Sequence, residues 1–413
     1  MTQRSRTRRT VGAASLLAAI WQIGAAPIGV AQVLTPEPNL VAPPPGSPPG
    51  TNESKAEEAP AAALTAPALT GPLSANPNPI SFDTGYPLGK FYFGGALTGM
   101  GLLQSNPVPG NHTATADAPS ALVWLQNNEG PFQIFAMAGG YSFPTLGTQY
   151  FHINKITGDT FGPAPVAYGK MVLTDEISVQ FGKLPTLIGA EYAFTFQNMN
   201  IERGLLWNQE PIISRGVQGN YSSGPLTVSL SLNDGLYSNN YSWISGLVSY
   251  TLNKSNTIAV AGGGSFKEVA KSTFVTLPPQ NNSRIINLIY TYNAEPWTIT
   301  PYFQYTDIPS SANLGIASAQ TYGGAVLANY KLTDTVNIAG RAEYIATSGS
   351  GNVLYGAGSS AGSLTLTPTW QNGIWFVRGE GSVVHAFDST FAFGRGGGTK
   401  TQMRGLLEGG IVF

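Results

Sequence analysis

The sequence contains no cysteine and little charge. Without cysteine among its 413 residues, a disulfide framework and thiol catalysis are both excluded. Charged residues make up 10% of the chain, against about 25% in ordinary soluble domains. The formal net charge of −1 indicates no nucleic-acid partner. Beyond the N-terminus no run of about 18 apolar residues occurs, so transmembrane helices are not expected.

The N-terminus has the features of a removable export signal. Four arginines, at positions 4, 6, 8 and 9, precede an apolar run from Val11 to Ile23 and then small residues up to Ala31. An anchoring helix is the alternative, but it needs about 20 apolar residues, more than this run supplies. We therefore predict a signal peptide over residues 1–31 and a mature chain outside the cytoplasm.

Residues 32–84 are rich in proline and alanine and show no usable period. This composition predicts a disordered periplasmic tether. The tether could be a spacer, or it could bind the cell wall or a partner subunit. Alternatively, it is simply an unstructured leader before the first strand.

From residue 85 to 413 the dominant pattern is alternation of apolar and polar residues. Leu226, Val228 and Leu230, for example, alternate with Thr227 and Ser229, and this spacing places alternate side chains on opposite faces of a sheet. The pattern predicts about sixteen strands, each long enough to cross a bilayer at a tilt. Their expected centres are Gly95, Val123, Ala136, Tyr168, Val179, Val217, Leu230, Gly246, Gly262, Leu288, Phe303, Val326, Gly340, Leu366, Gly379 and Glu408.

The connections between these segments alternate in length. Short ones, such as Asn127 to Gly130 and Thr333 to Asp334, alternate with mostly longer ones, such as residues 143–162 and 184–210. Short turns on one rim and long loops on the other are typical of an up-and-down membrane barrel. The fold class predicted is therefore all-β, a transmembrane antiparallel barrel with both chain ends on the periplasmic side.

Aromatic residues cluster beside the short turns, where an apolar ring with a polar edge suits the boundary between membrane and water. They predict an aromatic girdle made of Trp124, Tyr221, Tyr250, Tyr292, Trp297, Tyr330 and Trp370.

The chain ends in an alternating strand. Met403, Leu407 and the terminal Phe413 share one parity, and Arg404 and Glu408 share the other. A final phenylalanine on such a strand resembles the signature by which bacterial outer-membrane barrels are recognised for assembly. Phe413 is therefore the predicted assembly signal, and the barrel assembly machinery is a predicted partner.

Charges on the polar parity of the last strands form a predicted pore-lining set. Its members are Arg341, Glu343, Arg378, Glu380, Arg404 and Glu408. Facing a water-filled lumen, they could set a field that orders permeating solutes. Alternatively, they only pair with one another to satisfy a polar interior.

The long connection from residue 184 to 210 is the predicted constriction. It carries Glu191, Glu202 and Arg203, and loops of this length usually have a function or fold inward. Inside the lumen it would face the charged set and narrow the pore. The competing interpretation is a lid over the outer mouth.

The stretch from Phe181 to Pro211 carries a family resemblance. Phe181-Gly182-Lys183-Leu184-Pro185 and, further on, Glu202-Arg203-Gly204-Leu205-Leu206 resemble the β-barrel porin-2 family, also called OmpL-like. The chain departs from the family pattern at Leu187-Ile188-Gly189, where an aromatic residue usually precedes the glycine. The resemblance implies an outer-membrane pore without a defined substrate.

Catalysis finds little support. His112, His152 and His385 lie far apart in the sequence, with no spacing suited to a metal, so neither a metal nor a cofactor is expected. We predict a bacterial outer-membrane porin for passive diffusion of small hydrophilic solutes, with outer-membrane lipid and those solutes as partners and a homo-oligomer as an option. A closed barrel acting as an adhesin or structural anchor is the second hypothesis. A barrel hydrolase using His152 or His385 is the third.

Overall fold

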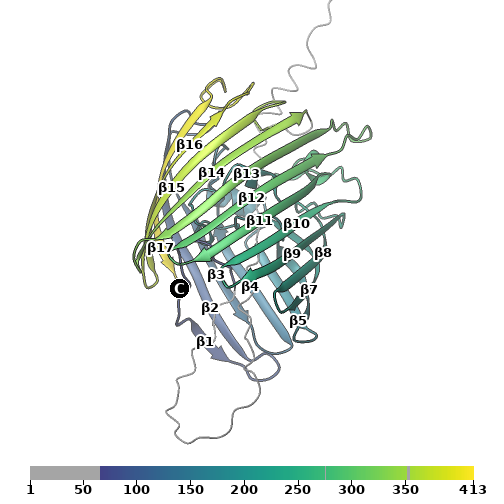
Figure 1. Cartoon of the computed structure of the whole chain (residues 1–413), viewed down its shortest axis with the longest axis vertical. Coiled ribbons are helices and arrows are strands. Elements are labelled where there is room, and N and C mark those ends of the chain that lie inside the picture. The colour runs from purple at the N-terminus through teal and green to yellow at the C-terminus, as the bar shows by residue number, and fades with distance from the viewer. Residues whose placement is uncertain (1–65, 275, 351–353) are drawn as a thin grey trace, which may run out of the picture.

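A computed structural model describes residues 66–274, 276–350 and 354–413. In these residues the strands form one antiparallel sheet, in which each strand from β2 to β17 pairs with the next and β17 pairs with β2 (Figure 1). The sheet is therefore a closed barrel of sixteen strands. The predicted fold class is confirmed.

All sixteen predicted centres lie inside the observed strands, one in each and in order. The barrel strands are β2 (Lys90–Gln104), β3 (Ala114–Asn127), β4 (Phe132–Tyr141), β5 (Val166–Val172), β6 (Ile177–Pro185), β7 (Ile213–Ser223), β8 (Leu226–Asn233), β9 (Trp243–Asn253), β10 (Asn256–Ser265), β11 (Arg284–Ala294), β12 (Trp297–Ile308), β13 (Ala319–Lys331), β14 (Val336–Gly349), β15 (Ser360–Asn372), β16 (Trp375–Ala386) and β17 (Thr401–Val412).

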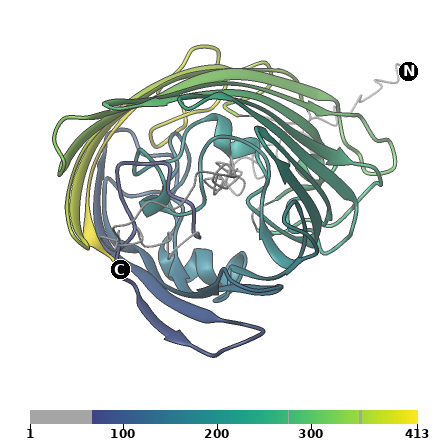
Figure 2. The ribbon, with the colours of Figure 1, turned by 60° about the horizontal axis from the view of Figure 1, so that its bottom comes forward.

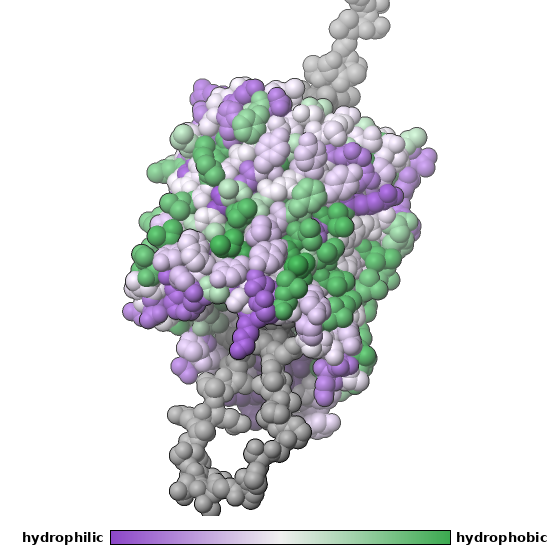
Figure 3. All heavy atoms as spheres, in the orientation of Figure 1, coloured by the Kyte–Doolittle hydropathy of each residue, from purple (hydrophilic) through white to green (hydrophobic). Residues whose placement is uncertain are grey.

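The alternation of side chains separates an apolar exterior from a polar interior. On β15 the outward Leu364 is 61% exposed, whereas the adjacent inward Thr365 is 6% exposed. The same alternation continues through Leu366 and Thr367. Hydrophobic side chains gather across the middle of the strands on the outer face shown in Figure 3, and hydrophilic ones gather towards the strand ends. Such a band suits contact with lipid.

The two rims differ as predicted. Seven tight turns lie on one rim of the described barrel, together with the C-terminus, and longer connections lie on the other. Gly130, Gly224 and Gly373 have positive φ values in three of the tight turns, which glycine adopts at little cost. The longer connections hold the helices α2 (Ile153–Asp159) and α3 (Pro278–Asn281) and the 3-10 turns η1 (Thr195–Gln197) and η2 (Leu206–Gln209). Of the described helices, none has the length and apolar character needed to cross a membrane.

The barrel closes where its last strand meets its first. Phe413 donates its N–H to the Gly95 carbonyl at 2.9 Å and accepts from the Gly95 N–H at 2.8 Å. A Cβ on Gly95 would lie 2.5 Å from the Phe413 ring, so the glycine leaves the space that the ring occupies. The C-terminal residue is therefore built into the seam. Its role as an assembly signal remains a prediction.

The segment before the barrel is more ordered than predicted. β1 (Ile80–Asp83) pairs with the start of β2 beyond the short-turn rim, and residues 66–74 lie inside the lumen. The expectation of an unstructured tether up to residue 84 is thus wrong for residues 66–84, because hydrogen bonds with barrel side chains satisfy part of the backbone of this segment. The predicted signal peptide and residues 32–65 lie outside the described residues.

Six of the seven predicted girdle residues lie on the outward parity near the short-turn rim, and the Trp297 ring packs at a tilt against Tyr330, with ring centroids 4.7 Å apart. Trp124 is the exception. It points inward, is 2% exposed and stacks on Phe196 at 5.7 Å. The prediction was wrong there because Leu122, Trp124 and their neighbours are apolar on both parities, so the local pattern does not identify the outer face.

Candidate functional site

The connection between β6 and β7, residues 186–212, folds into the lumen and does not cap the outer mouth. Its predicted constriction residues Glu191, Glu202 and Arg203 are at most 1% exposed. The view along the barrel shows these inner segments within the ring of strands (Figure 2). We call residues 186–212 the inner loop.

Arg341 on β14 links the barrel wall to the inner loop. Its Nη1 lies 2.5 Å from the Glu191 carboxylate and donates to the Glu202 carbonyl at 2.7 Å. Its Nε lies 3.1 Å from the carboxylate of Glu343 on the same strand. Glu343 in turn accepts from the N–H of Leu205 at 2.9 Å. Arg341 and Glu343 therefore hold both branches of the loop against one strand.

Arg378 on β16 and Glu408 on β17 form a second anchor. Nη2 of Arg378 lies 2.7 Å from the Glu408 carboxylate and donates to the Thr195 carbonyl at 2.5 Å. Nη1 donates to the Asn198 carbonyl at 3.0 Å, and the Thr195 hydroxyl donates to Glu408 at 2.5 Å. The cation satisfies loop carbonyls while the anion satisfies a loop hydroxyl.

Arg404 on β17 and Glu380 on β16 complete the set. Arg404 lies 2.6 Å from the Glu202 carboxylate and donates to the Thr145 carbonyl at 2.7 Å. Glu380 accepts the N–H groups of Ile201 and Glu202 at 2.5 and 3.0 Å. Charge-assisted hydrogen bonds of this kind are shorter and stronger than neutral ones, so the loop turn at Ile201 and Glu202 is held on two sides.

The predicted charged wall is consequently not an open surface. All six of its residues are at most 7% exposed and contact the inner loop or one another. Arg203, predicted to face this wall, forms no ion pair with it in the described residues. Its guanidinium lies 5.5 Å from the Trp207 ring, and its Nη1 donates to the Ile201 carbonyl. A direct part for these charges in ion selection remains a prediction.

The motif that carried the family resemblance lies at the centre of these contacts. The N–H of Gly204 donates to Glu191 at 2.8 Å. A Cβ on Gly204 would lie 2.0 Å from a carboxylate oxygen of Glu343. Glycine is therefore required for the close approach of this turn to the wall, and the following N–H of Leu205 reaches Glu343.

An aromatic cluster fills the lumen beside β3, β4 and β5, and sequence reasoning missed it. Phe143 packs at 6.2 Å from Phe194 and 6.0 Å from Trp207, and Phe194 stacks with Phe196 at 6.0 Å. The signal was the density of aromatic residues in the two longest loops, which is unusual for solvated connections. The interior is therefore partly a packed core and not uniformly wet.

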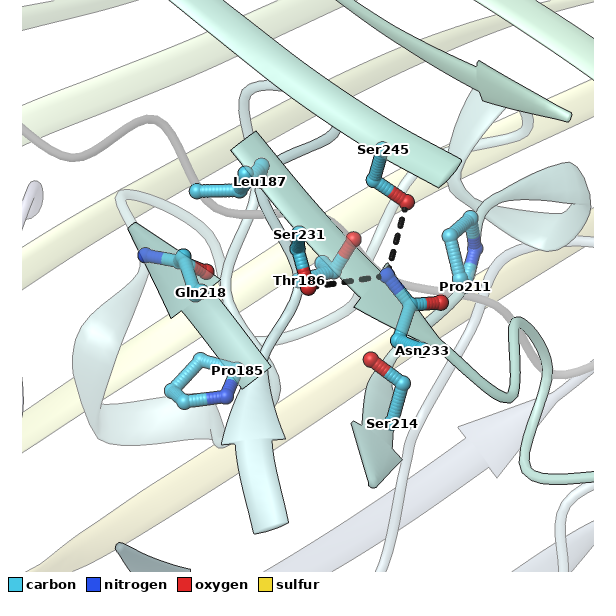
Figure 4. Close-up of a pocket in the computed structure, with 9 residues that line it drawn as sticks. All are labelled: Pro185, Thr186, Leu187, Pro211, Ser214, Gln218, Ser231, Asn233 and Ser245. Atoms are coloured by element: carbon cyan, nitrogen blue, oxygen red, sulfur yellow. Dashed lines mark hydrogen bonds between the residues drawn. The ribbon is translucent and has the colours of Figure 1, made fainter. Parts of the chain in front are cut away.

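The part of the barrel wall opposite the charged strands β14, β16 and β17 is formed by β7, β8 and β9, and most of its inward side chains are polar and uncharged. Ser214, Gln218, Ser231, Asn233 and Ser245 point inward and line a small pocket against the base of the inner loop (Figure 4). Nδ2 of Asn233 donates to the hydroxyls of Ser231 at 3.0 Å and Ser245 at 3.1 Å. Hydroxyl and amide groups both donate and accept hydrogen bonds, and these five side chains are at most 6% exposed because they pack against one another and the inner loop. We call these five residues the polar wall.

Glu210 is a buried acid near the end of the inner loop, and its carboxylate has no partner among the described residues. Neither of its carboxylate oxygens has a hydrogen bond in the described part of the chain, and neither has the hydroxyl of nearby Tyr302. Burial raises the pKa of the Glu210 carboxyl well above its usual range, and the charges of Glu191 and Glu343 raise it further.

Two of the three histidines contact polar side chains nearby. His152 lies 3.4 Å from Asp117, and His385 contacts the hydroxyl of Thr401 at 2.7 Å. Among the described residues, no three His, Asp or Glu side chains are placed to hold a metal ion.

A closed sixteen-strand barrel with an apolar outer band, a polar interior and a connection folded into its lumen defines a general outer-membrane channel of the porin class. The chain belongs to the family described as "Putative beta-barrel porin-2, OmpL-like", whose model matches residues 90–413. The protein is thus a component of the bacterial outer membrane.

Solved structures share this fold at low sequence identity. The outer membrane channel DcaP of Acinetobacter baumannii is 11% identical with a TM-score of 0.54, over 80% of this chain and 99% of that one. OmpT of Vibrio cholerae is 12% identical with a TM-score of 0.53, over 80% and 100%. An anion-selective porin from Comamonas acidovorans is 13% identical with a TM-score of 0.52, over 81% and 100%. No curated protein sequence matches the chain.

Proposed function

We propose that the protein is a porin through which small hydrophilic solutes diffuse passively, without catalysis. The observation that carries the proposal is the closed sixteen-strand barrel with a polar inward parity. The polar wall is an uncharged part of that interior, packed beside the inner loop. A barrel of sixteen strands is wide enough to keep an aqueous channel beside an inserted loop.

The distribution of charge supports uncharged solutes as the main cargo. The arginines and glutamates of β14, β16 and β17 already bind each other or the inner loop. The polar wall offers only hydroxyl and amide groups. Weak binding at several such groups lets a solute enter and also leave, which conduction requires. Selectivity between ions should accordingly be mild.

Reconstitution in a planar bilayer tests the pore, and liposome swelling in small sugars tests the cargo. The variant Ser231→Ala with Ser245→Ala removes two hydroxyls from the polar wall with little change in side-chain volume. We expect slower sugar uptake and lower step conductance from this variant. The control Leu230→Val changes an outward, lipid-facing residue of the same strand and should behave as the wild type. Equal uptake by all three proteins would remove the polar wall from the permeation path.

A closed barrel that acts as an adhesin or structural anchor is the second candidate. The aromatic cluster and residues 66–74 favour it, because both occupy part of the lumen. Complete electrical silence of the folded protein, together with binding that depends on the long connections, would support this candidate over the porin. Ester or peptide turnover by the pure protein would contradict both.

A further inference from the structure

Residues 66–74 lie inside the lumen, and two glutamine side chains of the barrel bind the ends of this segment in the same way. Oε1 of Gln126 accepts the N–H of Ala66 at 3.1 Å, and its Nε2 donates to the carbonyl of the same residue at 2.5 Å. Oε1 of Gln371 accepts the N–H of Ser74 at 2.9 Å, and its Nε2 donates to the Ser74 carbonyl at 3.0 Å. Each amide therefore pairs with both polar groups of one peptide residue, as a neighbouring strand would.

The middle of the segment contacts the tip of the inner loop. Nε2 of Gln197 donates to the Ala68 carbonyl at 2.9 Å, and the N–H of Thr70 donates to the Gln197 carbonyl at 3.0 Å. A Cβ on Gly71 would lie 2.3 Å from the carbonyl oxygen of Asn198. That position therefore accepts a residue without a side chain and no other.

Apolar contact adds a further point of recognition. Leu73 is 3% exposed and belongs to the same packed cluster as Trp124 and Phe196, against which Leu69 also packs. The ligand requirements of this surface are free peptide N–H and C=O groups at both ends of the segment, a glycine at one position and a leucine two residues later.

The position of the segment relates it to the conducting path. Gln126 is the penultimate residue of β3 and Gln371 is the penultimate residue of β15. Both strands end at the short-turn rim, so both glutamines lie there. Between these strands the sheet order runs through β16, β17 and β2. Residues 66–74 therefore cross the inside of this part of the wall, on the short-turn side of the inner loop.

We propose that Gln126, Gln197 and Gln371 form a binding site for the backbone of a peptide segment, and that residues 66–74 are its resident ligand. The occupied site narrows the lumen from the short-turn side. This second part rests on the porin function proposed above, whereas the binding site itself does not. The contacts are neutral hydrogen bonds, which each contribute little net free energy, so the attached segment owes its occupancy partly to its high effective concentration.

Gly71→Ala in the full chain tests the site, because the added methyl group meets the Asn198 carbonyl. The matched control is Gly219→Ala on β7, where a Cβ would meet nothing within 4 Å. We expect a larger step conductance from the Gly71 variant alone. Gln126→Leu with Gln371→Leu should act in the same direction by a different route. The gel shift between boiled and unboiled samples checks that every variant is folded.

A fluorescent synthetic peptide with the sequence of residues 66–74 provides a readout that needs no conduction. It should bind the detergent-solubilised Gly71→Ala protein, bind the wild type much less because the site is filled, and lower the variant's conductance. The same peptide carrying alanine for Gly71 should bind at least about tenfold more weakly, which corresponds to about 1.4 kcal/mol.

The outcomes separate the site from the pore. Equal affinity of the two peptides, or no binding of either, overturns the binding site. Binding of the native peptide with unchanged conductance overturns the narrowing role and leaves the site supported. Absence of conductance from every protein, including the wild type, overturns the proposed porin function, and the binding measurements still decide the site.

Discussion

Replacement of Arg341 by methionine should release the inner loop from the barrel wall. In the native protein Arg341 neutralises Glu191 of the loop and Glu343 of the wall, at 2.5 and 3.1 Å. Methionine fills similar space without charge. Both carboxylates would then remain buried without the cation that compensates them.

The expected magnitude follows from this loss. Removing one partner of a buried ion pair costs about 3–5 kcal/mol, because the other charge is left uncompensated. Each 1.4 kcal/mol is about a factor of ten in an equilibrium constant. If the whole penalty is relieved when the loop leaves the wall, the ratio of released to docked loop rises between about a hundredfold and a few thousandfold. The strands themselves should stay paired, because the substitution changes no backbone hydrogen bond.

Single-channel recording measures the effect as a larger mean step conductance with added open-channel noise from the mobile loop. Arg284→Met is the matched control, since the side chain of Arg284 is 65% exposed and lies 3.8 Å from Asp307. Adding Glu191→Gln to Arg341→Met should restore part of the wild-type conductance, because one buried anion is removed. An Arg341→Met channel with wild-type conductance and noise would refute the anchoring role.

Three further predictions test charge, pH and closure. Arg341→Gln with Arg378→Gln should shift the reversal potential in a salt gradient towards cation preference; an unchanged potential would remove both residues from selectivity. Glu210→Gln should raise the melting temperature in detergent above about pH 5 and change it little near pH 4. The reason is that the pKa of Glu210 is raised in the folded state, so the stability of the wild type falls as the pH rises above the unfolded pKa of about 4.3. A melting-temperature difference that does not vary with pH would contradict this. Gly95→Val should lower the yield of folded barrel several-fold in gels, as should removal of Phe413, because both disturb the contact that closes the seam.

Much of the fold could be predicted from local pattern. Strand centres, turn lengths and the inward direction of Arg341 and Glu408 all follow from a period of two, which each strand carries in its own residues. Where both parities are apolar, as around Trp124, the pattern does not show which side chains face the lipid. The inner face of β3 is then decided by what the lumen contains, here the ring of Phe196.

Local residue patterns are enough to predict a barrel of about sixteen strands with an apolar exterior, because strand direction and parity are local properties. The contents of the lumen depend instead on contacts between distant parts of the chain. The inner loop is held against the wall by ion pairs between its own charges and those of the barrel strands, such as Glu191 with Arg341 and Glu202 with Arg404. Residues 66–74 are held in the lumen by Gln126 and Gln371, which lie at the same rim. Such contacts depend on closure of the sheet, which brings together side chains that are far apart in the chain.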